Sequence, residues 1–326
     1  MKIIVVGLGS MGRRRIRLLA GIDKNIKICG VDLSDDRQKQ AQKELSIPTF
    51  SSIKDAVQNF SPDTAFVCTS PISHGNIVLE CLNNNLNVFT EINLLSDWYE
   101  EAQKIAQQKE LKLFISSTFL YRKEMQYLKE NLKGEIVNYI YHSGQYLPDW
   151  HPWENYKNFF VSNPKTNGCR EIFAIELPWI INTFGEIKDF CVMKSKMSTL
   201  EIEYNDNYIV SILHKNGTKG VFCLDVVSRK AVRSLEIFNE NKHIFWDGTP
   251  QGLKVYNTET KTEDFIQLYS SIEKNNNYTK SIIENAYSDE IIDFISMCQN
   301  NTIPKYSFER DYEILNLIDR IEEDND

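Results

Sequence analysis

The chain has 326 residues, of which 42% are hydrophobic and 25% are charged, both near the averages for soluble globular proteins. This length predicts about two domains, and it excludes a short peptide held together by disulfides. The 37 basic and 45 acidic residues give a net charge of -8. Because that charge would repel a phosphate backbone, no nucleic-acid partner is expected.

No apolar run approaches the roughly 18–20 residues that a membrane-spanning helix needs, and the run at residues 3–6 is too short for a signal-peptide core. We therefore expect a cytoplasmic protein with no membrane partner. The cysteines are odd in number, scattered and without a C-x-x-C pair, which predicts reduced thiols and no metal site. The seven are Cys29, Cys68, Cys81, Cys169, Cys191, Cys223 and Cys298.

In residues 1–120, short apolar runs alternate with amphipathic stretches, the pattern of βαβ units. Strands are predicted at residues 3–6, 26–31, 64–68, 87–89 and 112–115. Helices are predicted at residues 10–20, 36–45, 53–59, 74–83 and 96–109. This alternation predicts an α/β domain with a doubly wound parallel sheet, the Rossmann architecture.

In residues 121–326, a helix at 122–132 is followed by longer strands at 136–146, 187–197, 208–215, 219–227, 232–239 and 243–246. We expect an α+β domain with a large, mostly antiparallel open sheet. Asn216-Gly217 is its strongest hairpin signal, since both residues accept positive φ. Residues 258–281 are predicted to be a long connection, and two helices carrying Ile291 and Ile318 are expected to close the chain.

A glycine motif follows the first strand and opens the first helix: Gly7-Leu8-Gly9-Ser10-Met11-Gly12. In this context the first glycine makes a tight turn, the second lets backbone amides approach a pyrophosphate, and the third lets helix and strand pack. Asp32 lies 20 residues after Gly12, where its carboxylate can accept hydrogen bonds from the adenosine ribose. It would repel a 2′-phosphate, which favours NAD over NADP. The alternative is a plain turn and a surface acid.

The chain resembles the glucose–fructose oxidoreductase and inositol dehydrogenase family (Gfo/Idh/MocA) over nearly its whole length. The resemblance rests on the glycine motif, on Thr69-Ser70-Pro71-Ile72-Ser73-His74 and on Val88-Phe89-Thr90-Glu91. It implies that Thr69, Ser70, Pro71 and His74 border the cofactor and that Glu91 lies close to the nicotinamide ribose. For His74 the alternative is a polar residue in a helix's first turn, and for Thr69 and Ser70 a plain loop.

Two departures from the family pattern concern the residues that move protons. The usual Glu-Lys-Pro is here Glu91-Ile92-Asn93, so the lysine that in the family touches both cofactor and substrate is absent. The family's Asp and the His four residues later align with Glu171 and Ile175, to about one helical turn. Hydride transfer at a carbinol carbon needs a titratable group near the hydroxyl, so either other residues serve or the ordinary chemistry is lost.

A replacement set is suggested by a segment in which aromatic residues alternate with charged ones, Tyr146-Leu147-Pro148-Asp149-Trp150-His151-Pro152-Trp153-Glu154-Asn155-Tyr156-Lys157. It resembles a Leu-Pro-Asp-Trp loop in family members associated with surface-sugar metabolism. Aromatic rings stack on the apolar face of a pyranose while charged groups bind its hydroxyls. We expect His151, Tyr156 or Lys157 to supply the acid/base, with Glu171 and Arg170 contacting substrate. Trp150 and Trp153 bind substrate in this hypothesis, or else are core or subunit-interface anchors.

These patterns together favour an NAD-linked oxidoreductase that interconverts hydroxyl and keto groups of a sugar or sugar derivative. Its second domain, residues 121–326, would bind substrate and mediate oligomerisation. The resemblance implies a homodimer or homotetramer paired through the open face of that sheet. The rival hypothesis is a non-catalytic nucleotide-binding sensor or assembly protein that kept the cofactor fold after losing the lysine and the histidine.

Overall fold

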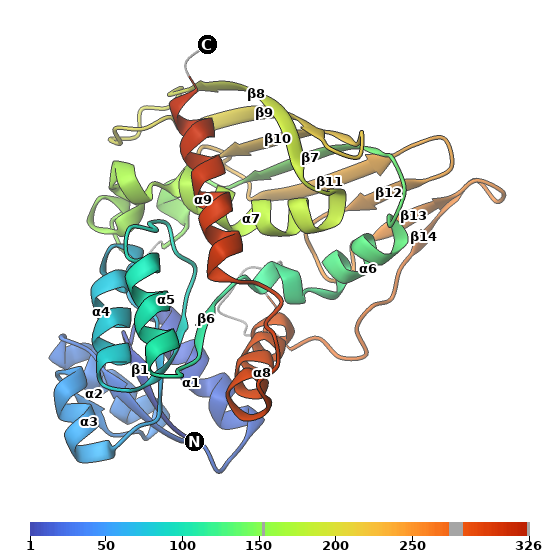
Figure 1. The fold of residues 1–326 in the computed structure, drawn as a ribbon. Coiled ribbons are helices and arrows are strands. Elements are labelled where there is room, and N and C mark those ends of the chain that lie inside the picture. Colours follow the sequence, from blue (N-terminus) through green and yellow to red (C-terminus); the bar gives the residue numbers. More distant parts are fainter. Residues whose placement is uncertain (152–153, 274–282, 325–326) are drawn as a thin grey trace. The chain divides into compact units, whose positions relative to one another are not determined.

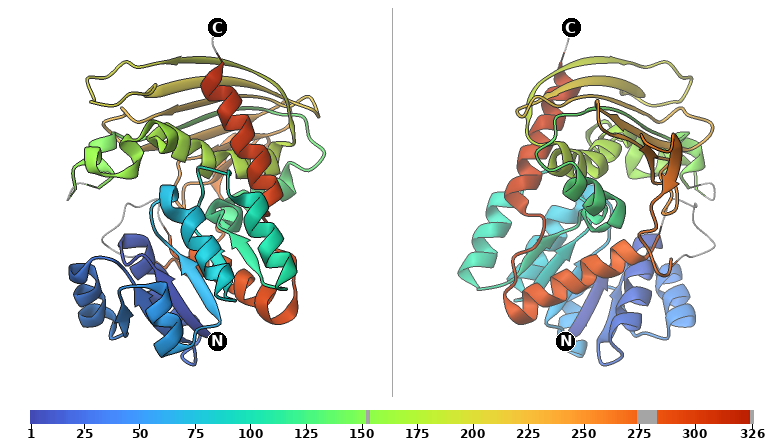
Figure 2. Two further views of the ribbon diagram at one scale, coloured as in Figure 1. Left: turned by 60° about the vertical axis from the view of Figure 1, so that its left-hand side comes forward. Right: turned by 90° about the vertical axis from the view of Figure 1, so that its right-hand side faces the viewer.

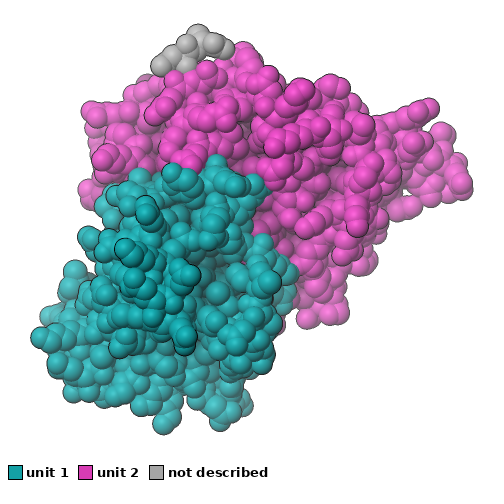
Figure 3. Space-filling model, viewed as in Figure 1, with its two compact units in different colours: residues 1–118, 287–315 teal, residues 119–286, 316–326 magenta. Residues whose placement is uncertain are grey.

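The computed structural model describes residues 1–151, 154–273 and 283–324. The chain divides into two compact units (Figure 3). The first comprises Met1–Thr118 and Tyr287–Leu315, and the second comprises Phe119–Ala286 and Asn316–Asp326. The first boundary lies two residues before the predicted one. We predicted that residues 121–326 form the second domain, but the segment Tyr287–Leu315 belongs to the first unit.

The first unit contains a six-stranded parallel sheet in the order β3-β2-β1-β4-β5-β6, which is the predicted doubly wound topology. Figure 1 labels its strands β1 and β6. Its strands are β1 (Lys2–Val6), β2 (Lys27–Val31), β3 (Thr49–Phe50), β4 (Thr64–Val67), β5 (Asn87–Thr90) and β6 (Leu113–Ile115). Strands β1 and β4 are almost wholly buried, as expected for a sheet covered on both faces. The two-residue β3 was too short to be recognised in the sequence.

Right-handed crossovers place two helices, α1 and α2, on one face of this sheet and three, α3 to α5, on the other. Their bounds are α1 (Ser10–Ile22), α2 (Asp35–Leu45), α3 (Ile53–Phe60), α4 (Pro71–Asn83) and α5 (Tyr99–Gln108). All five were predicted, but α4 begins at Pro71 rather than at His74. Proline is well suited to this first position, because its missing N–H has no helical partner there.

Helix α8 (Asn285–Asn300) returns from the end of the chain to cover the same face as α1. Its Phe294 ring packs edge-on against Phe66 of β4 and Phe89 of β5, with ring centroids 5.4 and 5.5 Å apart. Phe89 also stacks on Phe114 of β6 at 5.1 Å. This aromatic cluster explains why α8 belongs to the first unit although it follows the second in sequence.

The second unit contains an eight-stranded sheet in the order β14-β13-β12-β11-β7-β10-β9-β8. All neighbouring strands are antiparallel except β10 and β7, so the predicted architecture is confirmed. Gly217, at φ 94°, forms the predicted hairpin turn between β9 and β10. The strands are β7 (Asn138–Gly144), β8 (Ile187–Ser195), β9 (Asn207–His214), β10 (Lys219–Asp225), β11 (Val232–Phe238), β12 (His243–Trp246), β13 (Lys254–Asn257) and β14 (Thr262–Phe265).

Helix α7 (Gly168–Phe184) packs on one face of this sheet (Figure 2). Phe173 of α7 lies edge-on to Tyr208 and Phe222 of strands β9 and β10. The remaining helices are α6 (Lys123–Asn131), α9 (Phe308–Glu323) and five 3₁₀ turns at Thr118–Tyr121, Leu147–Asp149, Tyr156–Asn158, Phe160–Ser162 and Pro164–Thr166. Within the described part of the chain, no helix is both long and apolar enough to cross a bilayer.

The predicted long connection at residues 258–281 is corrected in its first part, which contains strand β14. Strand β14 pairs with β13 as a hairpin, with Tyr256 opposite Glu263. All four residues of β14 are exposed, so no apolar alternation signals the strand. Residues 274–282 lie outside the described part of the chain.

Candidate functional site

The glycine turn after β1 needs glycine at two positions for packing. Gly7 has φ +93°, and a Cβ there would lie 2.7 Å from the Cys68 carbonyl oxygen. A Cβ on Gly12 would lie 1.8 Å from the Gly7 carbonyl oxygen. The first glycine therefore allows close approach of β4, and the last allows α1 to pack on the turn, as the motif predicts.

Gly9 is different, because a Cβ added there would meet nothing within 4 Å. Helix α1 begins at the next residue, and Gly9 provides no side-chain cap for it. A helix N-terminus presents backbone amides and a partial positive charge, which together favour an anion. The open space at Gly9 therefore fits the pyrophosphate of a dinucleotide, and the bare glycine leaves room for its approach to the backbone.

Asp32 lies just after β2, beside this turn. Its Oδ2 accepts a hydrogen bond from the Leu8 amide at 2.8 Å, and its Oδ1 accepts one from the Ser34 amide at 2.9 Å. Each carboxylate oxygen can accept a further bond, so the group can also receive ribose hydroxyls. Arg37 Nη1 lies 3.8 Å from Oδ2, and its side chain is 55% exposed.

The loop after β4 is anchored by His74. Its Nε2 lies 2.9 Å from the Thr69 carbonyl oxygen, and its Nδ1 lies 2.6 Å from the Asn93 side-chain oxygen Oδ1. Burial lowers the pKa of His74, so the ring is neutral and carries one N–H. Both partner oxygens can only accept, so the single N–H of the ring donates to one of them. His74 thus holds the loop in place, while Ser70 is exposed and Pro71 begins α4.

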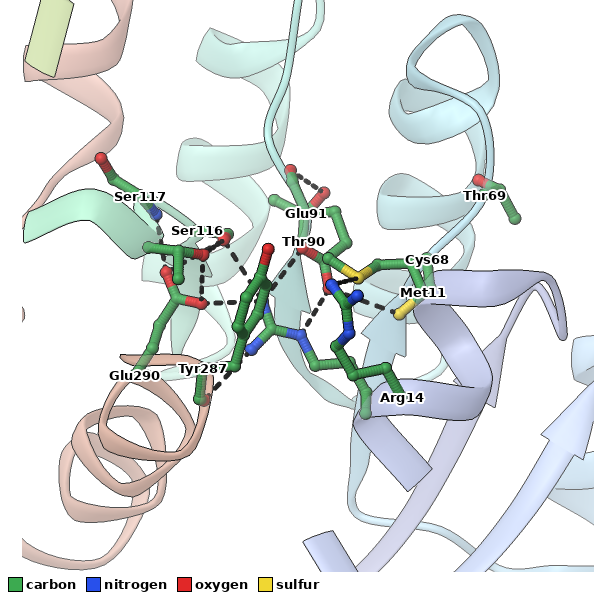
Figure 4. Close-up of polar contacts among 12 residues, drawn as sticks. Met11, Arg14, Cys68, Thr69, Thr90, Glu91, Ser116, Ser117, Tyr287 and Glu290 are labelled. Carbon is green, nitrogen blue, oxygen red and sulfur yellow. Dashed lines mark hydrogen bonds and ion pairs between the residues drawn. The ribbon is translucent and has the colours of Figure 1, made fainter. Parts of the chain in front are cut away.

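Glu91, at the end of β5, is bound by a residue that sequence reasoning did not select. Arg15 Nε lies 2.6 Å from Glu91 Oε1, and Arg15 Nη2 lies 3.0 Å from Oε2. The same Nη2 lies 2.7 Å from Glu290 Oε2 on α8. Figure 4 shows Glu91 and Glu290 with the polar contacts around them. The sequence signal for this cluster was the arginine run that follows Gly12.

In the second unit, the predicted substrate segment divides into separate contacts. Trp150 Nε1 donates to the Gln145 carbonyl at 3.0 Å, and the His151 ring lies against Phe159 at 4.3 Å. Tyr156 accepts a hydrogen bond from the Glu201 amide, and Lys157 Nζ pairs with the Glu201 carboxylate at 2.5 Å. Trp153 lies outside the described residues.

Two charge effects distinguish the titratable groups of this segment. Burial lowers the pKa of His151. The hydrogen bond from Lys157 to Glu201 raises the pKa of that lysine, which keeps it protonated and makes it a poor base. Tyr156 and Lys157 therefore both contact Glu201 in the structure, and neither side chain is without a partner.

Arg170, predicted to contact substrate, is buried and paired. Its Nη2 lies 2.7 Å from Asp319 Oδ1, and its Nη1 donates to the Glu322 carboxylate. Both acids lie in the last turns of α9. These ion pairs attach α7 to the last turns of α9, which accounts for the buried position of Arg170. Because the partners are about 150 residues apart, no local sequence pattern reveals them.

Glu171, the next residue of α7, has the properties of an acid/base group. Its Oε2 is buried and has no hydrogen-bond partner among the residues that the structure describes. Burial raises the pKa of Glu171 to about 7, because loss of solvent disfavours the charged carboxylate. A carboxyl group with a pKa near neutrality can both take and give a proton at physiological pH. Ile175, one turn later on α7, is partly exposed and cannot titrate.

Comparison with known proteins finds a family match for most of the first unit. Residues 1–116 match the model of the oxidoreductase family with an NAD-binding Rossmann fold, Gfo/Idh/MocA. Myo-inositol 2-dehydrogenase of Thermotoga maritima is 24% identical over 139 residues, 42% of this chain and 41% of that protein. The match thus spans less than half the length of this relative.

Solved structures extend the similarity of fold to nearly the whole chain. The WlbA dehydrogenase from Bordetella pertussis, in complex with NADH and UDP-GlcNAcA, matches with a TM-score of 0.75 at 13% identity over 98% of this chain and 94% of that one. Biliverdin reductase from Synechocystis, in complex with biliverdin and NADP+, matches with a TM-score of 0.76 at 14% identity over 98% and 97%. The glycine turn lies within residues 1–116, the segment of this chain that matches the Gfo/Idh/MocA family model.

Proposed function

We propose that the chain binds NAD and catalyses hydride transfer between the nicotinamide and a hydroxyl or keto carbon of a sugar derivative. The observation that carries the proposal is the open space at Gly9, at the N-terminus of α1, inside a segment that matches an NAD-binding family model. The first unit would hold the dinucleotide. The second would bind substrate, as proposed for residues 121–326.

The preference for NAD over NADP rests on Asp32. Its carboxylate faces the turn with both oxygens held by backbone amides, so it cannot swing away from an incoming nucleotide without losing these bonds. A fixed negative charge there favours ribose hydroxyls and repels a 2′-phosphate. Arg37, 3.8 Å from Asp32, partly offsets that charge. We therefore expect a preference for NAD rather than strict exclusion of NADP.

Glu171 is proposed to carry the substrate proton. NAD, when bound, supplies the acceptor for the hydride. As the carbinol carbon gives up its hydride, the hydroxyl loses a proton, and the Glu171 carboxylate takes it. In the reverse direction the protonated Glu171 returns it to the carbonyl oxygen. The group fits this role because its pKa is about 7 and its buried Oε2 is unpaired among the described residues.

A sugar derivative is favoured by the names of similar proteins and by the aromatic segment. The similar proteins include an inositol dehydrogenase and a dehydrogenase bound to a nucleotide sugar. Trp150 and His151 lie in a segment with several other aromatic residues, which suits stacking on a sugar ring. The biliverdin reductase has the same fold with another substrate, so the substrate depends on side chains rather than on fold.

The proposal includes a homodimer or homotetramer formed through the outer face of the second sheet, in the cytoplasm. Three neighbouring strands expose apolar side chains on this face, Ile140 of β7, Val221 of β10 and Ile209 of β9. Ile140 lies opposite Val221 in the sheet register. An exposed group of this kind is typical of a contact between proteins.

The rival function is that of a nucleotide-binding protein without catalysis. Ile92 and Ile175 favour it, since they stand where the family resemblance implies a lysine and a histidine. Incubation of the purified protein and NAD with sugars, sugar phosphates and nucleotide sugars, followed by NADH absorbance and product analysis, separates the two functions. Turnover of one substrate class supports the oxidoreductase. NAD binding without turnover of any class supports the rival.

A further inference from the structure

The buried cluster of Arg15, Glu91 and Glu290 in the first unit was given no role in the function proposed above. Arg15 is fully buried on α1, three residues after Gly12. Its guanidinium binds Glu91 through two nitrogens and Glu290 through one. A bidentate contact of this kind fixes the plane of the carboxylate, which a lysine ammonium cannot do.

The guanidinium also lies close to two aromatic rings. Its central carbon lies 4.5 Å from the centroid of the Phe89 ring and 5.2 Å from that of Tyr287. Arg14, the preceding residue, lies 4.6 Å over the same Tyr287 ring, and its Nη1 lies 3.5 Å from Met11 Sδ in the glycine motif. These contacts connect α8 to the first turns of α1.

Glu290, which contacts Arg15, also accepts hydrogen bonds from residues that follow β6. Its Oε1 accepts hydrogen bonds from the Ser117 amide at 2.7 Å and from the Ser116 hydroxyl at 2.9 Å. Its Oε2 accepts one from the Thr118 hydroxyl at 3.2 Å. Burial raises the pKa of Glu290, yet every donor around it favours the ionised form. The geometry thus makes Glu290 the anchor that fixes Arg15.

The position of Glu91 gives the cluster a functional meaning. In a doubly wound sheet the dinucleotide lies across the carboxyl ends of the strands. Asp32, at the end of β2, marks the adenosine half, and the glycine turn after β1 marks the pyrophosphate. The nicotinamide half then extends over the ends of β4 and β5, where Glu91 follows Thr90.

We infer that Arg15 and Glu290 are positioning residues for the nicotinamide half of the cofactor, acting through the Glu91 carboxylate. The inference rests on the proposed NAD site. Arg15 sets the plane of the Glu91 carboxylate, and Glu290 sets Arg15. Substitution of either would weaken binding of the nicotinamide nucleotide half and leave the adenosine half unaffected.

The test compares NAD with ADP, which lacks the nicotinamide nucleoside, by calorimetric titration of folded variants. Arg15→Lys and Glu290→Gln are expected to bind ADP as the wild type does and NAD about tenfold more weakly, the loss expected for one charge-assisted hydrogen bond. Arg310→Lys is the matched control, since the Arg310–Glu313 pair lies in the same unit and the Glu313 side chain is 63% exposed. It should change neither affinity.

Three results would overturn the inference. Equal weakening of NAD and ADP would show a general loss of fold, and unchanged NAD affinity in both folded variants would show that the cluster positions nothing. If Arg15→Lys lacks a cooperative unfolding transition, it is not folded, and the affinities of Glu290→Gln alone test the inference. Absence of binding of both nucleotides by the wild type would contradict the proposed cofactor site itself, a result distinct from the first two.

Discussion

Two glutamates on helix α7 show opposite ways of burying a carboxylate. Glu176 is fully buried and accepts hydrogen bonds from Tyr141, Trp179 and Arg233. Glu171, five residues earlier, has a buried Oε2 with no partner in the described part of the chain. A fully paired carboxylate stabilises the fold, whereas an unpaired one costs stability and keeps a titratable group near neutral pH. This difference supports a structural role for Glu176 and is the basis of the proton-transfer role proposed for Glu171.

The largest expected effect that tests this comparison is on turnover. Glu171→Gln removes the titratable proton but preserves size, so turnover of the substrate found in the panel should fall about 10²–10⁴-fold. The measurement is initial rate by NADH absorbance, with NAD affinity as the control. Turnover within about twofold of wild type would take the proton role away from Glu171.

The next effect is on stability and concerns Glu176. Glu176→Gln leaves the Arg233 guanidinium, which Glu176 Oε1 contacts at 2.6 Å, without its counter-charge. Loss of one partner of a buried ion pair costs about 3–5 kcal/mol, measured by urea denaturation at pH 8. Glu171→Gln, on the same helix, is the matched control and should raise rather than lower the free energy of unfolding at that pH, because it removes an ionised carboxylate whose buried Oε2 is unpaired among the described residues. Equal costs for the two variants would remove the distinction between the glutamates.

The pH dependence of stability sharpens the same contrast. The folded-state pKa of Glu171 is raised to about 7, above its unfolded value, so the folded state binds the extra proton between the two values. The contribution of this group therefore declines as pH rises from about 4.5 to about 7, by up to about 3 kcal/mol. The free energy of unfolding of wild type minus that of Glu171→Gln should show this slope. A difference independent of pH would contradict the raised pKa.

The smallest effect concerns the exposed pair of Lys157 and Glu201. Surface ion pairs contribute less than about 1 kcal/mol, and the Glu201 side chain is 75% exposed. Lys157→Ala should therefore change the free energy of urea unfolding by less than that amount. A fall in turnover as large as that of Glu171→Gln would return the proton role to this segment.

The sequence predicted those parts of the fold that depend on local pattern. The glycine turn, the alternation of buried strands and helices, and the Asn216-Gly217 hairpin each depend on residues close together in the chain. Strand β14 was missed because its four residues are all exposed. A strand without a buried face leaves no periodic signal.

The site was harder to predict than the fold, because its partners are distant in sequence. Arg15 and Glu290 are separated by 275 positions, and Arg170 and Glu322 by 152. Arg170 looked available for substrate only because its acidic partners lie at the end of the chain. Glu171 was selected through the family alignment, but its unpaired oxygen is visible only in the structure.

The central claim, that the turn beginning at Gly7 binds NAD, has a direct test in Gly9→Ala. The added Cβ would enter open space, so the fold should be kept, but it would occupy the approach to the α1 N-terminus. Gly21→Ala is the matched control, since Gly21 lies on the same helix and also meets nothing within 4 Å. Calorimetric titration with NAD should show binding by wild type and Gly21→Ala, and binding at least about tenfold weaker, or 1.4 kcal/mol, by Gly9→Ala. Equal affinities for all three proteins, or no binding by the wild type, would contradict the account.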